Sequence, residues 1–177
     1  MDNIDLINSK AEKIKLIATD IDGVLTKGEI IFTGSGKEIK IWNVRDGLAC
    51  TMLKSAGHIK LAWITGRTSD NVKERSRELK IDYVIQGCLS KKQAIDFIVE
   101  KEKIDAEQIA YIGDDVVDIP ALREAGLAVC PSDAVKEVKD VSDYISHVKG
   151  GEGVFRDIVE VVLKAKNKWQ DAIKIFE

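Results

Sequence analysis

The sequence has little of what marks membrane-bound, exported or nucleic-acid-binding proteins. None of its apolar runs approaches the ~20 residues that a membrane-spanning helix needs. Its acidic N-terminus, residues 1–5, lacks the basic and then apolar layout of a signal peptide. The net charge of −3 is small and mixed in sign, which does not indicate nucleic acid or a membrane surface as a partner. We therefore expect a cytoplasmic protein that binds neither.

Cysteine and histidine are scarce as well. The three cysteines, Cys50, Cys88 and Cys130, are odd in number, widely spaced and set in apolar segments. This pattern predicts small buried hydrophobic residues in a reducing compartment rather than disulfides. The two histidines, His58 and His147, have no metal-ligand spacing with each other or with a cysteine, so the sequence does not indicate a zinc site.

Proline is rare, and nothing in the composition suggests a linker between domains. The chain has two prolines, no internal repeat and no low-complexity stretch. Its 177 residues, 45% hydrophobic and 32% charged, are typical of one globular domain that can bury a core of its own. We expect a single domain over residues 1–177.

Short apolar runs alternate along the chain with longer segments of helical period. The runs, expected as strands, are residues 14–19, 59–64, 83–86, 109–112, 127–129 and 144–145. The expected helices are residues 3–13, 46–56, 69–80, 91–103, 119–126 and 134–138. Such alternation is typical of βαβ units. It predicts an α/β fold with a Rossmann-like, doubly wound parallel sheet.

Two segments fall outside this alternation. Residues 29–33 and 37–44 are rich in β-branched residues and flank a Gly/Ser-rich turn, which predicts a protruding β-hairpin over residues 29–44. Asp46 is expected to cap the helix that follows, and Gly57 to end it. At the other end, Gly150-Gly151-Glu152-Gly153 breaks the chain before a helical tail, about residues 152–177, with Trp169 and its neighbours continuing the helix.

Polar motifs follow four of the predicted strands. They are Asp20/Asp22, Thr65, Lys91 and Asp114/Asp115, with Lys92 as an alternative to Lys91. In open α/β sheets the carboxyl ends of the strands are where ligands bind, so these side chains should converge. The presence of four such motifs, each after a predicted strand, is stronger evidence for a shared site than any single motif.

The residue types suit phosphoryl transfer. Asp20 can attack phosphorus and form an aspartyl-phosphate. Asp22 can protonate the leaving oxygen and later activate water. Clustered carboxylates need a cation, and oxygen ligands suit Mg²⁺, which the Asp20 carboxylate, the Asp22 backbone carbonyl and Asp114 would hold. The sequence therefore predicts a Mg²⁺-dependent phosphatase.

The remaining polar residues have supporting roles in this interpretation. Thr65 can donate to a phosphoryl oxygen, helped by the backbone N–H groups of Gly66 and Arg67. Lys91 can neutralise charge on the phosphoryl group and the nucleophile. Asp115 and Asp118 are expected to orient Lys91 or metal-bound water.

Each motif alone has an ordinary explanation. Aspartates are common in turns, and a Thr-Gly pair or a lysine is common at a helix start. A phosphorylation-controlled receiver domain, which is a binding module, also places acidic residues, a Thr and a Lys at strand ends. In a receiver the Thr and Lys follow a lone acceptor Asp, whereas here Thr65 and Lys91 precede the second acidic pair. The order therefore disfavours a receiver.

With these motifs the sequence resembles the haloacid dehalogenase superfamily of phosphohydrolases over nearly its whole length. Asp20 to Thr26 is similar to the first motif of that superfamily, Ile64 to Arg67 to the second, Lys91 to the third and Gly113 to Asp118 to the fourth. The superfamily inserts its caps between these motifs. Here residues 27–64 and 68–90 leave no room for one, so the resemblance implies a cap-less member.

Within the superfamily the sequence resembles the 3-deoxy-D-manno-octulosonate 8-phosphate phosphatases most. The shared features are the hairpin, the Asn43-Val44-Arg45-Asp46-Gly47 segment, Gly113-Asp114-Asp115 and Gly150–Gly153. This resemblance implies hydrolysis of a sugar-acid phosphate for lipopolysaccharide precursor synthesis. It also implies a homotetramer in which hairpins pack together and C-terminal segments reach a neighbour's site.

Two alternatives stay open, one about the substrate and one about whether the chain is catalytic. The 2-keto-3-deoxynonulosonate 9-phosphate phosphatases share the same frame but tend to carry Glu where this chain has Arg67. Arg67 would suit a substrate carboxylate through a bidentate contact, and Arg45 and Arg75 are weaker substrate candidates. The other alternative, from a different class, is a phosphatase-like domain retained for assembly without catalysis.

Overall fold

The computed structural model describes residues 3–177, which form a six-stranded parallel sheet between two layers of helices. The strand order is β5-β4-β1-β6-β7-β8. The strands are β1 (Leu16–Thr19), β4 (Lys60–Ile64), β5 (Tyr83–Ile85), β6 (Ile109–Ile112), β7 (Leu127–Cys130) and β8 (Tyr144–Ile145). The chain runs outward from β1 in both directions, so the predicted doubly wound parallel sheet is confirmed.

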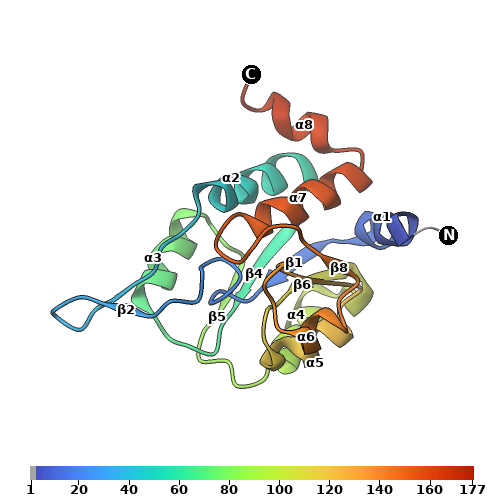
Figure 1. Cartoon of the computed structure of the whole chain (residues 1–177). Helices are drawn as coiled ribbons and strands as arrows, with labels where there is room; N and C mark the ends of the chain where they lie inside the picture. Colours follow the sequence, from blue (N-terminus) through green and yellow to red (C-terminus); the bar gives the residue numbers. More distant parts are fainter. Residues whose placement is uncertain (1–2) are drawn as a thin grey trace.

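The helices divide between the two faces of the sheet (Figure 1). One face is covered by α1 (Asn3–Lys13), α2 (Val44–Met52), α3 (Asp70–Glu78), α7 (Val154–Ala165) and α8 (Trp169–Lys174). The other is covered by α4 (Lys91–Glu102), α5 (Ile119–Glu124) and α6 (Lys136–Lys139). In residues 3–177, no helix is long and apolar enough to cross a bilayer.

The central strands are buried on both faces, which explains their continuous apolar sequence. Successive side chains of β1 point to opposite cores: Ile17 joins the α2/α7 side, whereas Leu16 and Ala18 join the α4/α5 side. Both layers therefore fix the position of β1, the strand that precedes the first acidic motif.

The predicted hairpin is present, but its strands are shorter than expected. They are β2 (Ile31–Phe32) and β3 (Glu38–Ile39), paired antiparallel with Ile31 opposite Ile39. The hairpin protrudes from the body (Figure 1), and an isolated two-stranded ribbon has no third strand to extend its ladder. The prediction that residues 40–44 continue the strand was wrong: residues 40–43 lead into α2 without a ladder partner.

The ends of the helix after the hairpin also differ from the prediction. Asn43, not Asp46, is the N-cap of α2, and its side chain accepts a hydrogen bond from Arg45 N–H (2.9 Å). Asp46 lies in the first turn, where its Oδ1 accepts from the backbone N–H of Arg156 (2.9 Å). A π-helical turn, Leu53–Gly57, follows α2, and the left-handed residue that ends it is His58, with φ of 49°, rather than Gly57.

The C-terminal tail is two helices rather than one. Val154, Ile158, Val162 and Leu163 of α7 are fully buried, as the amphipathic pattern predicts. The chain then turns at Asn167, whose φ is 58°, and α8 packs back onto the Leu53–Gly57 turn. The prediction that Trp169 continues the same helix was therefore wrong, although Trp169 packs on the body.

Candidate active site

The predicted catalytic residues line one cavity of about 350 Å³ at the carboxyl edge of the sheet. Asp20 follows β1, Thr65 follows β4, and Lys91 begins α4 beside them. The lining residues are Asp20, Asp22, Thr65, Gly66, Arg67, Cys88, Leu89, Lys91 and Val117. Asp20 and Lys91, about 70 positions apart in the sequence, thus meet at one cavity, as the strand-end argument predicts.

Asp20 is almost fully buried, and both its side chain and its backbone N–H have partners. Its Oδ1 accepts hydrogen bonds from Ile21 N–H (2.7 Å) and pairs with Lys91 Nζ (2.7 Å). Its backbone N–H donates to Ile112 O of the neighbouring strand β6 (2.9 Å). These contacts fix the orientation of the Asp20 carboxylate. A nucleophile needs such a fixed orientation because it must approach phosphorus along a defined line.

The turn after Asp20 needs glycine at position 23. Gly23 has φ of 91°, and a Cβ there would lie only 2.0 Å from Asp114 Oδ2. Glycine therefore lets the β1 turn and the β6 loop approach each other closely. The same turn is braced from the C-terminal side, where Gly151 N–H donates to Val24 O (2.9 Å).

Three carboxylates crowd at this point. Asp20, Asp114 and Asp118 can each offer an oxygen within 4.8 Å of the others. Burial, followed by the charge of Asp118, raises the pKa of Asp20 to about 6 and that of Asp114 to about 8. Asp114 Oδ1 is buried and has no hydrogen-bond partner within residues 3–177. An all-oxygen site of this kind fits a hard divalent cation such as Mg²⁺.

Asp118 and Asp115 have different surroundings. Asp118 is fully buried, and its two oxygens accept from Tyr111 Oη (2.6 Å) and the backbone N–H of Asp114 (3.1 Å). It also lies 3.5 Å from Lys91 Nζ, so it can orient that lysine as expected. Asp115 is exposed and caps the turn Val116–Asp118, accepting from Val116 N–H (2.7 Å). In the described chain Asp115 has no ion pair with Lys91.

Lys91, rather than Lys92, is the lysine of the cavity. Its side chain is 4% exposed, and its Nζ donates to Ile64 O (2.6 Å) in addition to pairing with Asp20. Lys92 points outward and pairs with Asp96 (3.0 Å) and Glu124 (3.2 Å) on the surface. The sequence alternative between the two lysines is thus resolved by geometry.

Thr65, Gly66 and Arg67 form the wall beside Lys91. Thr65 is buried, and its Oγ1 accepts from Arg67 N–H (3.2 Å), which leaves the hydroxyl proton available to a ligand. The Arg67 guanidinium donates to Glu38 Oε1 (2.8 Å) of the hairpin and lies 4.0 Å from Asp22 Oδ2. Arg67 therefore stands at the cavity with a carboxylate partner from its own chain.

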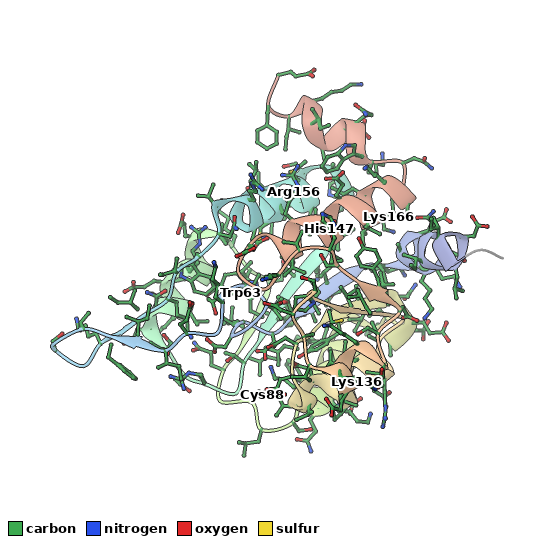
Figure 2. The ribbon with its side chains drawn as sticks, viewed as in Figure 1. Trp63, Cys88, Lys136, His147, Arg156 and Lys166 are labelled. Atoms are coloured by element: carbon green, nitrogen blue, oxygen red, sulfur yellow. The ribbon has the colours of Figure 1, made fainter. Side chains whose placement is uncertain are left out.

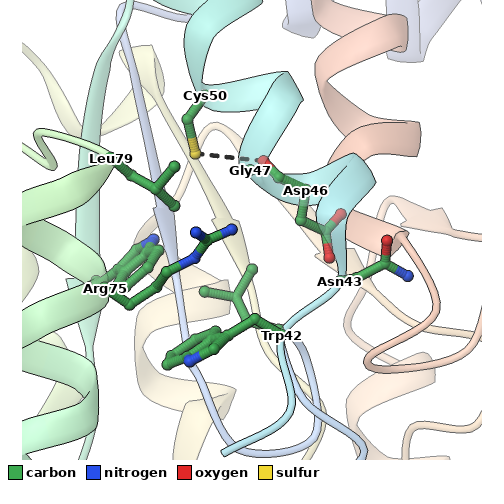
Figure 3. A pocket seen from close by; sticks show the side chains of 9 residues that line it. Trp42, Asn43, Asp46, Gly47, Cys50, Arg75 and Leu79 are labelled. Atoms are coloured by element: carbon green, nitrogen blue, oxygen red, sulfur yellow. Dashed lines mark hydrogen bonds between the residues drawn. The ribbon is translucent and has the colours of Figure 1, made fainter.

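The other two arginines lie outside this cavity. Arg45 is exposed near the start of α2, close to Gly153. Arg75 extends from α3 toward α2 and lies against Gly47, where its guanidinium lines a separate small cavity with Trp42 and Asp46 (Figure 3). The structure thus brings Arg67, but neither Arg45 nor Arg75, to the predicted catalytic residues.

Several residues of the site were not predicted from the sequence. Lys40 and Glu38 of the hairpin reach it, since Lys40 pairs with Asp22 Oδ1. Their alternating positions after the turn show that they share a face, but no pattern shows that this face meets Asp22. Cys88, in the loop after β5 (Figure 2), lines the cavity and is only half-buried, so the prediction of a buried residue was wrong for it.

Comparisons with known proteins identify relatives of this chain. A family profile described as haloacid dehalogenase-like hydrolase matches residues 84–158. The 3-deoxy-D-manno-octulosonate 8-phosphate phosphatase KdsC of Salmonella typhi is 37% identical over 168 residues, which cover 94% of this chain and 88% of that protein.

Solved structures are similar over almost the entire chain. One is a 3-deoxy-D-manno-octulosonate 8-phosphate phosphatase from Moraxella catarrhalis in complex with magnesium ion, phosphate ion and KDO. It has a TM-score of 0.93 and 42% identity, covering 97% of this chain and 98% of that one. Another is the cobalt-bound phosphatase of Haemophilus influenzae, with a TM-score of 0.88 and 36% identity, covering 93% of this chain and 99% of that one.

Proposed function

We propose that this chain, which belongs to the 3-deoxy-D-manno-octulosonate 8-phosphate phosphatase family of haloacid dehalogenase-like hydrolases, hydrolyses that eight-carbon sugar-acid phosphate. The observation that carries the proposal is the convergence of Asp20, Thr65 and Lys91 at one cavity, with a carboxylate oxygen of Asp114 within 4.8 Å of one of Asp20. Family membership supports the substrate, and the cavity supports the chemistry. The product would serve lipopolysaccharide precursor synthesis in the cytoplasm.

Mg²⁺ fits the acidic end of the cavity. Asp20, Asp114 and the backbone carbonyl of Asp22 would hold it, with Asp118 and Asp115 supporting the loop that carries Asp114. When bound, the cation neutralises the crowded carboxylates and the phosphate, which lets an anionic nucleophile meet an anionic substrate.

The chain's own residues account for the two chemical steps. An Asp20 oxygen attacks phosphorus, the bond from phosphorus to the sugar oxygen breaks, and Asp22 gives that oxygen a proton. Asp22 then takes a proton from water as the water attacks the aspartyl-phosphate, and the phosphorus–Asp20 bond breaks. Lys91 and Thr65 stabilise charge on the phosphoryl oxygens in both steps. Both aspartates finish in their starting protonation states.

Arg67 is the best-placed residue for the substrate carboxylate. It borders the cavity beside Asp22, and its planar guanidinium can bind a carboxylate through two parallel hydrogen bonds. A substrate carboxylate would compete with Glu38 for it. Arg45 and Arg75 stay weaker candidates because they lie outside the cavity. A nine-carbon 9-phosphate is the alternative substrate, and Arg67 in place of Glu argues against it.

Assembly as a homotetramer is the second part of the proposal. The protruding hairpin exposes a hydrophobic patch, here called the hairpin patch, made of Ile30, Ile31, Phe32, Ile39 and Ile41. Exposed apolar groups gathered on one projection favour burial against another protein surface. Hairpins that pack together between subunits would cover the patch and help to enclose a site that has no cap.

A phosphate-release screen tests the function. The purified chain with Mg²⁺ should release phosphate from 3-deoxy-D-manno-octulosonate 8-phosphate with a kcat/KM at least about tenfold above that for the nine-carbon 9-phosphate and for simple hexose phosphates. Chelation of the metal should abolish release, and added Mg²⁺ should restore it. A preference for the nine-carbon substrate would refute the substrate assignment. Release from none of them would favour a non-catalytic assembly domain.

A further inference from the structure

Lys40 is buried although the hairpin that carries it is mostly exposed. Its side chain is 2% exposed, whereas the neighbouring Ile39 and Ile41 face solvent. A lysine ammonium is costly to bury unless charged partners compensate for the lost water. The position of Lys40 is therefore determined by its partners.

Those partners connect the hairpin to the acid/base residue. Lys40 Nζ pairs with Asp22 Oδ1 and lies 3.5 Å from Glu38 Oε1, which in turn accepts from Arg67 Nη2 (2.8 Å). Four charges of alternating sign thus run from Asp22 through the hairpin to Arg67. Asp22 is the one member of this chain of charges to which the reaction assigns proton transfer.

The pairing leaves the two oxygens of Asp22 in different environments. Oδ1 is engaged by Lys40, whereas Oδ2 is buried and has no hydrogen-bond partner within residues 3–177. Arg67 Nε lies 4.0 Å from Oδ2. Asp22 lines the catalytic cavity, and Oδ2 is its oxygen that has no partner in the part of the chain that the structure describes. Proton transfer requires such an oxygen within hydrogen-bond reach of the leaving group.

We propose that Lys40 is a positioning residue, which holds Asp22 Oδ1 so that Oδ2 is presented to the leaving oxygen of the substrate. The proposal rests on the phosphatase function proposed above. It makes the hairpin part of the catalytic apparatus as well as a contact surface. If Lys40 only fastened the hairpin to the body, its loss would affect all substrates alike.

The test compares substrates that differ in their need for an acid. A primary alkyl phosphate such as the eight-carbon sugar-acid phosphate has a poor leaving group that requires protonation, whereas para-nitrophenyl phosphate has a good one that does not. The quantity to measure is kcat/KM, because it reports only the steps through leaving-group departure. We expect Lys40→Met to lower kcat/KM about 100-fold for the alkyl phosphate, and less than about fivefold for the aryl phosphate. Equal losses for both, or no loss, would overturn the proposal.

A matched control and a double variant show whether the effect is specific to Lys40 and whether it depends on Asp22. Lys37→Met removes an exposed lysine from the same hairpin and should leave both substrates unaffected. In an Asp22→Asn background, Lys40→Met should cause no further loss with the alkyl phosphate, because Lys40 acts through Asp22. Additive losses in the double variant would show that Lys40 acts independently of Asp22 and would reject the proposal.

The proposal stays testable if Lys40→Met does not fold, and its failure can be distinguished from failure of the phosphatase function. If Lys40→Met does not fold, Lys40→Arg keeps the buried charge but displaces the Asp22 carboxylate, and a selective loss of about tenfold for the alkyl phosphate is expected. Equal effects of Lys40→Arg on both substrates would again overturn the proposal. Failure of the phosphatase function looks different, because the wild-type chain would then release phosphate from neither substrate.

Discussion

Lys91 lies between the proposed nucleophile and a fully buried aspartate, and this position gives its ammonium group two tasks. It pairs with Asp20 at 2.7 Å and lies 3.5 Å from Asp118, so it neutralises carboxylates in the resting site. The same group would stabilise the charge that develops on the phosphoryl oxygens. Its contribution should therefore appear in turnover more than in stability.

We predict that Lys91→Met lowers kcat/KM for the eight-carbon phosphate about 100- to 1000-fold while the circular dichroism spectrum stays that of the wild type. Lys92→Met is the matched control, because Lys92 is the next residue and pairs only on the surface. That control should stay within about twofold of the wild type. Similar activities for the two variants would contradict the assigned role of Lys91.

Asp46 gives a prediction about stability and pH. Burial raises its pKa from 3.8 to about 6, so the folded chain binds its proton more tightly than the unfolded chain does. The stabilisation from this group is complete below pH 3.8 and is lost as the pH rises through about 6.

The Asp46→Asn variant should lack this dependence. The free energy of unfolding of the wild type, relative to that of the variant, should fall by up to about 3 kcal/mol between pH 4 and pH 7. Urea unfolding of both proteins at several pH values measures the difference. A relative stability that stays flat or rises with pH would refute the assignment.

Single residues of the site were predictable where parallel strands alone determine their position. Asp20, Thr65 and Asp114 follow strands of one sheet, so the strand pattern was sufficient to bring them together. Lys40 could not be predicted, because its place depends on how the hairpin folds back over Asp22. The surroundings of Arg75 could not be predicted either, because the charged residues beside it in the sequence are typical of an exposed helix face.

At the scale of elements, the strands that the core buries were predicted well, and the exposed or terminal segments less well. β6 (Ile109–Ile112), which is buried at every position, has the predicted bounds, and among the less buried segments so does the edge strand β8 (Tyr144–Ile145). The hairpin ladder is shorter than its sequence suggests because β-propensity alone does not extend an isolated pair. The start of α2 was misplaced because both Asn43 and Asp46 are good capping residues, and only tertiary contacts choose between them.

Helix α8 is a second case in which periodicity was insufficient. It packs on the Leu53–Gly57 turn, with Ala172 fully buried and the Arg156 guanidinium 5.1 Å from the Trp169 ring centroid. Figure 2 shows Arg156 where α2, α7 and α8 meet. The tail therefore stabilises the face of the sheet opposite α4 and α5.

We predict that Trp169→Ala lowers the free energy of unfolding by about 2 kcal/mol, through lost packing and a lost cation–π contact. Activity at low temperature should be unchanged, since no residue of α8 lines the cavity of its own chain. Gln170→Ala, at an exposed position of the same helix, is the control and should change stability by less than about 0.5 kcal/mol. Equal effects of the two substitutions in urea unfolding would show that α8 does not support the body.

For the whole molecule, the helices of residues 3–177 pack on the two faces of the sheet, and the hairpin reaches Asp22 at its carboxyl edge. Neither gap between the superfamily motifs holds a cap among the described residues, as the spacing of the motifs predicted. In the proposed assembly, the hairpin and other subunits would enclose the site. The tetramer is expected only from the resemblance to the family, because the sequence of one chain does not show how subunits pack.

Phe32→Lys tests the assembly. Phe32 is 61% exposed in the hairpin patch, and a charge there should prevent hairpins from packing together, so light scattering should show smaller species than the tetramer proposed for the wild type. Phe97→Lys is the control, because Phe97 is an exposed aromatic residue on α4, on the other side of the sheet. A tetramer unaffected by Phe32→Lys would show that the hairpin patch is not the interface.

One comparison of variants tests whether Asp20 is the nucleophile of a Mg²⁺-dependent phosphatase. Phosphate release from 3-deoxy-D-manno-octulosonate 8-phosphate should be measured for the wild type and for Asp20→Asn, both with Mg²⁺ and both shown to be folded by circular dichroism. The amide cannot form the aspartyl-phosphate, so we predict a loss of at least about 1000-fold in kcat. Turnover by Asp20→Asn within about tenfold of the wild type would exclude Asp20 as the nucleophile.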